Sequence, residues 1–94
     1  MKTYFLAYGN DLGTRDKLVS VLNSIPEIKG WRYDMPNTFY IHSEMPHGEL
    51  ISLIRSKCGG KGRCLLIEMG SQHGWLPKDT WAFIHKFERE DEGK

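Results

Sequence analysis

This chain has few cysteines, no long apolar run and little net charge, and each of these absences argues against a class of protein. It has two cysteines, too few for the disulfide framework of a small secreted protein. No stretch approaches the ~20 consecutive apolar residues that span a bilayer. The formal net charge is only +1, which argues against a disordered chain and against a strong non-specific nucleic-acid binder.

What is present favours one folded domain. The 94 residues are 39% hydrophobic and 12% aromatic, which is enough apolar surface to build a core. Residues 1–8 are basic and then apolar, but this run is too short for a signal peptide and lacks a cleavage site of small residues. We therefore expect a cytoplasmic protein with no membrane segment, one domain over residues 1–87, and a charged tail over residues 88–94 that frays.

Alternation of apolar side chains predicts four strands, over residues 2–8, 31–35, 38–42 and 63–69. The turn dipeptide Pro36-Asn37 joins the second and third strands into an antiparallel hairpin.

Apolar residues at helical spacing predict the helices. One stripe lies between Thr14, a suitable N-cap, and Pro26, which ends the helix. A second helix runs from Pro46 to the glycine pair at residues 59–60. After Pro77, the residues Trp81, Phe83, Ile84 and Phe87 fit a short C-terminal helix. The order strand, helix, strand, strand, helix, strand predicts an α+β fold of ferredoxin-like, split β-α-β type. Its antiparallel sheet would carry helices on one face, with the short C-terminal helix as an addition.

The turn after the first strand, Gly9-Asn10-Asp11, has two interpretations. A carboxylate here can serve a hard cation such as Mg²⁺, which needs several oxygen ligands, and Asp16 and Asp34 are the nearest further candidates. The other interpretation is a strand-to-helix turn, for which Gly, Asn and Asp are the usual residues. We favour the turn.

The two cysteines, Cys58 and Cys64, have five residues between them, a wider spacing than the paired ligands of a zinc knuckle. None of the four histidines completes a recognised ligand signature. The two cysteines have two interpretations, a redox pair or two small residues in the core or at its edge. We favour the second. The sequence therefore predicts no metal site and no cofactor, with Mg²⁺ entering only if the chain is a nuclease.

The most unusual stretch of the sequence runs from residue 55 to residue 63. It contains four glycine or cysteine positions and four cations, namely Arg55, Lys57, Lys61 and Arg63. Glycine backbone can approach an anion closely while Lys and Arg supply charge, so these four residues are candidates for binding nucleic acid or phosphate. Cations near a helix C-terminus followed by a glycine turn give a purely structural explanation of the same residues.

Aromatic side chains form the last candidate set, with Trp31 and Tyr33 as its leading members. Interleaved with Arg32, they have the composition of a surface that stacks bases. The same composition suits a dimer interface or the core, and we favour these two.

Several segments resemble the superfamily that contains VapD and the second CRISPR-associated protein. They are the opening strand Met1-Lys2-Thr3-Tyr4-Phe5-Leu6-Ala7-Tyr8, the hairpin strand Thr38-Phe39-Tyr40-Ile41, the late strand Leu65-Leu66-Ile67-Glu68, and the closing segment Gly74-Trp75-Leu76-Pro77-Lys78-Asp79-Thr80-Trp81. The resemblance runs over most of residues 1–87 and implies homodimers. Its nuclease members are proposed to use an Asp directly after an aromatic residue at the end of the first strand. Here Gly9 and Asn10 follow Tyr8, and the first acid is Asp11.

Two functions follow as expectations. The first is a non-catalytic homodimeric binding or regulatory module, such as a mobile element encodes, that contacts nucleic acid or a protein partner. The alternative is a Mg²⁺-dependent nuclease with Asp11 as its catalytic carboxylate. The sequence favours the first.

Overall fold

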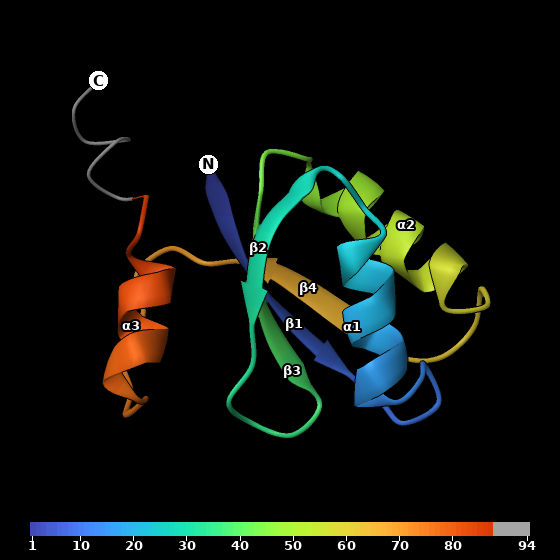
Figure 1. The fold of residues 1–94 in the computed structure, drawn as a ribbon, viewed down its shortest axis with the longest axis horizontal. Coiled ribbons are helices and arrows are strands. Elements are labelled where there is room, and N and C mark those ends of the chain that lie inside the picture. Colours follow the sequence, from blue (N-terminus) through green and yellow to red (C-terminus); the bar gives the residue numbers. More distant parts are fainter. Residues whose placement is uncertain (88–94) are drawn as a thin grey trace.

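The computed structural model describes residues 1–87 of the chain and contains a four-stranded antiparallel sheet and three helices (Figure 1). In chain order the elements are β1 (Lys2–Tyr8), α1 (Arg15–Asn23), β2 (Ile28–Arg32), β3 (Thr38–Ser43), α2 (His47–Lys57), β4 (Cys64–Glu68) and α3 (Lys78–Ile84). This confirms the predicted α+β class and antiparallel sheet. The predicted fraying of residues 88–94 lies outside the described residues.

The strands lie in the order β2-β3-β1-β4, and every neighbouring pair is antiparallel. In the register of the sheet, Tyr8 pairs with Cys64, Ala7 pairs with Thr38, and Arg32 pairs with Tyr40. The last residues of β1 and β2 therefore lie at the same end of the sheet as the first residues of β3 and β4. The functional site described below is built at this end.

The main core lies between one face of the sheet and the helices α1 and α2. Every second residue of β1 is buried on this face, because side chains of a strand alternate between faces. The buried apolar side chains are Tyr4, Leu6, Tyr8, Leu12, Leu18, Val21, Leu22, Ile25, Phe39, Ile41, Leu50, Ile54 and Leu66.

Local signals place the helices. The Thr14 hydroxyl accepts a hydrogen bond from the Lys17 main-chain N–H at 3.2 Å, which confirms Thr14 as the N-cap of α1. The helix α2 begins directly after Pro46 and ends before Gly59 and Gly60, both of which have positive φ. No helix among the described residues is long and apolar enough to cross a membrane.

The helix α3 lies on the face of the sheet opposite to α1 and α2 (Figure 1). The Phe83 ring stacks on the His42 ring of β3 with centroids 3.9 Å apart, and the Thr80 hydroxyl accepts a hydrogen bond from Nε of Arg32 at 2.8 Å. The expectation of helices on one face thus holds for α1 and α2, while α3 covers part of the second face.

The second strand is shifted from its predicted position over residues 31–35. The structure places β2 at Ile28–Arg32, and the chain has left the sheet by Asp34. The reason is a side-chain contact that no local pattern reveals: Asp34 accepts hydrogen bonds from the hydroxyls of Thr80 and Tyr40, at 2.6 and 3.3 Å. The turn at Pro36-Asn37 stands as predicted, with Asn37 at φ 58°.

Candidate functional site

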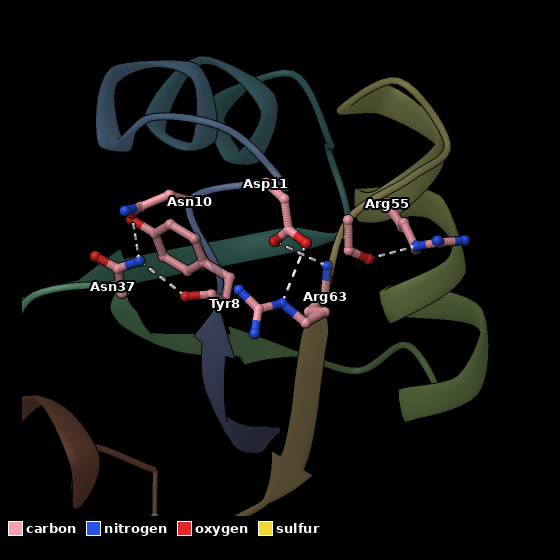
Figure 2. A network of polar contacts seen from close by, with 7 residues as sticks. Tyr8, Asn10, Asp11, Asn37, Arg55 and Arg63 are labelled. Carbon is pink, nitrogen blue, oxygen red and sulfur yellow. Dashed lines mark hydrogen bonds and ion pairs between the residues drawn. The ribbon is translucent and has the colours of Figure 1, made fainter.

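Two loops that are far apart in the sequence are joined at the end of the sheet where β1 finishes. The Asp11 carboxylate accepts hydrogen bonds from the main-chain N–H of Arg63 at 3.2 Å and from its Nε at 3.1 Å (Figure 2). Gly62, at φ 108°, lies against this loop so closely that a Cβ there would be 2.5 Å from the Leu12 Cα. Only glycine fits such an approach, so the glycine turn and the Asp11 turn form one unit.

The Asp11 carboxylate is held in its charged form by this arrangement. The Arg63 main-chain N–H lowers the pKa of Asp11 most, and the Arg63 guanidinium lowers it further by hydrogen bonding and charge. The side chain of Arg63 nevertheless remains 83% exposed. Asp11 therefore orients the guanidinium while leaving it open to a ligand from solvent.

The remaining cations of the glycine turn lie around this pair. Nε of Arg55, in the last turn of α2, donates a hydrogen bond to the Gly62 carbonyl at 3.0 Å (Figure 2). Lys57 ends α2 and Lys61 lies in the turn, and both side chains are exposed. The four cations singled out in the sequence thus belong to one surface.

Trp31 and Tyr33 belong to the opposite edge of the sheet; Trp31 is level with Ile41 and Tyr4, and Tyr33 lies beyond the last residue of β2, on the side of the basic residues. Their rings stack at 6.3 Å with an angle of 6° between planes, and Nε1 of Trp31 donates a hydrogen bond to Oδ1 of Asn23 at 2.8 Å. The guanidinium of Arg15 lies 4.2 Å from the centroid of the Tyr33 ring. Trp31, Arg15 and Phe39 thus surround the Tyr33 ring, which remains 38% exposed.

Arg15 and Tyr8 connect the two groups across the end of the sheet. Burial raises the pKa of the Tyr8 hydroxyl, and the charge and hydrogen bond of Arg15 partly oppose that rise. Beside Tyr8, Nδ2 of Asn37 donates to the Tyr8 carbonyl and to Oδ1 of Asn10, each at 2.9 Å (Figure 2). Between Tyr8 and Arg63 a shallow hollow of about 350 Å³ opens beside β4.

We call this surface the basic end and define it by its six cations, Arg15, Lys17, Arg55, Lys57, Lys61 and Arg63. Sequence reasoning found four of them and missed Arg15 and Lys17, because these belong to the first turn of α1. Their only signal was position: a helix that follows β1 must begin at the end of the sheet where β1 finishes.

Among the described residues, the other candidate metal ligands do not lie close together. Asp16 lies in the first turn of α1, whereas Asp34 lies under α3 with Thr80 and Tyr40. In residues 1–87 no group of three or more His, Cys, Asp or Glu side chains is placed to hold a metal ion. Cys58 and Cys64 are free, half-buried thiols packed against the core, and burial raises the pKa of Cys58.

The chain was compared with protein-family models, with curated proteins and with solved structures, and none of the three comparisons gives a match.

Proposed function

We propose that the chain is a non-catalytic homodimeric binding module that contacts the phosphate backbone of nucleic acid through the basic end. The observation that carries this proposal is the charge of that surface. Residues 9–17 and 55–63 contain six cations and two carboxylates, an excess of four positive charges in a chain whose total is +1. A surface that concentrates charge in this way attracts a polyanion even when the whole molecule is nearly neutral.

The geometry of the cations favours phosphate over a carboxylate-bearing protein partner. Arg63 is oriented by Asp11 and presents the planar fork that matches phosphate oxygens. Lys57 and Lys61 flank it as exposed point charges, and Gly59 and Gly60 between them have positive φ and carry no side chain that would hinder the approach of an anion. Several cations spaced along one end of the sheet match a chain of phosphates better than a single acidic side chain.

The fold assignment belongs to the same proposal. We assign the first six elements to the ferredoxin-like type, with α3 as an addition, and the strand order β2-β3-β1-β4 supports this assignment. The resemblance to the VapD and CRISPR-associated superfamily is likewise a proposal, and the role of a small regulator of a mobile element follows from it.

The alternative, a Mg²⁺-dependent nuclease, rests on that resemblance and on Asp11. In this role the Asp11 carboxylate would bind the cation beside Arg63, which donates one hydrogen bond to each of its oxygens and whose positive charge opposes a second cation. The alternative therefore makes a distinct prediction: Arg63→Gln would strengthen Mg²⁺ binding.

A matched pair of double variants tests the proposal. Lys57→Gln with Lys61→Gln removes two charges from the basic end, whereas Lys2→Gln with Lys29→Gln removes two charges from the opposite end of the sheet. Binding of single-stranded RNA and DNA is measured by fluorescence anisotropy at low salt. We expect the first variant to bind at least about tenfold more weakly than wild type and the second to bind like wild type.

Three results would contradict the proposal. If nucleic-acid binding weakens equally in both double variants, the affinity depends on net charge and not on a site at the basic end. Absence of binding to either nucleic acid would point to a protein partner instead. Cleavage that requires Mg²⁺ and is lost in Asp11→Asn would overturn the non-catalytic assignment in favour of the nuclease.

A further inference from the structure

The two edges of the sheet differ in how they are protected against pairing with another strand. The edge strand β2 has a register irregularity between Ile28 and Gly30 and an exposed Lys29, two devices that block strand addition. Within the described residues β4 pairs regularly with β1 alone, and its sequence Cys-Leu-Leu-Ile-Glu has no Pro, Gly or Lys. The β2 edge is thus protected against strand addition, whereas the β4 edge is not, and we call β4 the open edge.

The open edge is also apolar on the second face of the sheet, in the part of that face that α3 leaves uncovered. Leu65 and Ile67 are 59% and 48% exposed, although residues of this type in a regular strand are ordinarily covered. The contacts of α3 are with β2, β3 and the first residues of β1, so this helix leaves β4 uncovered.

The main chain of β4 fixes which groups point outward. The Arg63 carbonyl accepts from the Gly9 N–H, and the Met69 N–H donates to the Thr3 carbonyl, so both residues face β1. In an antiparallel ladder alternate residues face alternate sides. The N–H and C=O groups of the even-numbered residues, Cys64, Leu66 and Glu68, therefore face away from the sheet.

We infer that a second copy of this chain pairs with this edge, β4 against β4 in antiparallel orientation, with Leu66 opposite the partner's Leu66. This register uses all three outward residues and forms about six main-chain hydrogen bonds. It places Leu65 opposite the partner's Ile67, and Ile67 opposite the partner's Leu65, so the exposed apolar side chains cover one another. The result is a continuous sheet across two molecules.

Charge supports a second copy as the occupant. Arg63 precedes β4 and Glu68 ends it, so antiparallel self-pairing brings the cation of one chain to the end of the strand where the other chain has its anion. No like charges lie opposite one another in this register. The strand is thus complementary to itself, and a strand of unrelated sequence would match it only by chance.

The expected affinity is modest. Five residues from each chain make an interface at the small end of the known range, so we expect a dissociation constant between about 1 and about 100 µM. This inference rests on the homodimer part of the proposed function and supplies its geometry. The contact between the basic end and nucleic acid does not depend on it.

Two single variants and their mixture test both the interface and its register. Leu65→Lys places a cation opposite the partner's Ile67, and Ile67→Glu places an anion opposite the partner's Leu65. In an equimolar mixture, the new cation of one chain lies opposite the new anion of the other, while the second pair stays apolar. Met35→Lys, at an exposed apolar position outside β4, is the matched control.

Analytical ultracentrifugation from about 5 to about 500 µM gives the readout, in a range that brackets the expected dissociation constant. We expect wild type and Met35→Lys to dimerise, each β4 variant alone to stay monomeric, and the mixture to form heterodimers. A monomeric wild type, or dimers that survive in both single variants, would overturn the inference. Failure of the mixture to dimerise would overturn the register centred on Leu66. In either case nucleic-acid binding by the monomer would still be measurable, so failure here is distinguishable from failure of the basic-end proposal.

Discussion

Acid should weaken the folded state through a single histidine that joins α3 to the sheet. His42 is only 1% exposed, with its ring stacked on Phe83 and in edge contact with Phe87. Its Nε2 is buried and has no hydrogen-bond partner within residues 1–87. Protonation would therefore place a charge in a desolvated site between aromatic rings, and its desolvation cost exceeds what the one hydrogen bond to the Phe83 main chain returns.

The size of the effect follows from the pKa of His42. Burial lowers this pKa from 6.5 to about 4; a hydrogen bond to the Phe83 main chain opposes the change, while Lys86 and the N-terminal ammonium add to it. Because the folded pKa is the lower one, the unfolded chain binds the proton first. Stability is then complete above pH 6.5 and falls as the pH decreases towards 4. A difference of about 2.5 pKa units corresponds to about 3 kcal/mol, of which about 2.5 kcal/mol is lost at about pH 4.5.

Urea unfolding followed by tryptophan fluorescence at about pH 7.5 and about pH 4.5 measures this loss. Carboxylates with lowered pKa, such as Asp11, also lose stability in acid, so the His42 part is obtained by difference from the variant His42→Gln. We expect His42→Gln to lose about 2.5 kcal/mol less than wild type over this interval, and His73→Gln, at an exposed position, to behave like wild type. An equal loss in wild type and His42→Gln would refute the reasoning.

Three further stability predictions follow from single contacts. Gly62→Ala should cost at least about 2 kcal/mol of folding stability, because its Cβ would meet the Leu12 backbone at a positive φ. Gly48→Ala, with open space in α2, should be neutral or stabilising by up to about 1 kcal/mol. Thermal unfolding of both variants checks this, and equal effects would contradict it. Thr14→Ala should cost about 1 kcal/mol by removing the N-cap of α1, which urea unfolding measures, and an unchanged midpoint would count against the cap. Tyr4→Phe should cost about 1 kcal/mol in the same assay, because the Tyr4 hydroxyl donates to the Met45 carbonyl at 2.7 Å, and no loss would show that the bond contributes nothing net.

Features that depend on neighbouring residues were predictable from the sequence. The alternation of β1 and β4, the cap at Thr14 and the glycine end of α2 each act over a few residues, and the structure confirms them. Strand order and the side of the sheet that each helix covers depend on packing between distant segments. The placement of α3 on the second face could therefore not be read from its own residues.

The candidate site shows the same division. The cations from Arg55 to Arg63 are visible as a cluster because they are close in sequence. Asp11 and Arg63 lie 52 residues apart, and nothing local reveals that they pair. The end of β2 at Arg32 was missed for the same reason, since the contacts of Asp34 with Tyr40 and Thr80 draw the chain out of the sheet.

The salt dependence of nucleic-acid binding tests the central claim most directly. For single strands each phosphate that a cation neutralises contributes about 0.7 to the slope of log K against log salt. Lys57→Gln with Lys61→Gln should therefore reduce the wild-type slope by about 1.4, while Lys2→Gln with Lys29→Gln should leave it unchanged. A wild-type slope near zero, or the same slope in all three proteins, would contradict the claim that the basic end binds nucleic acid.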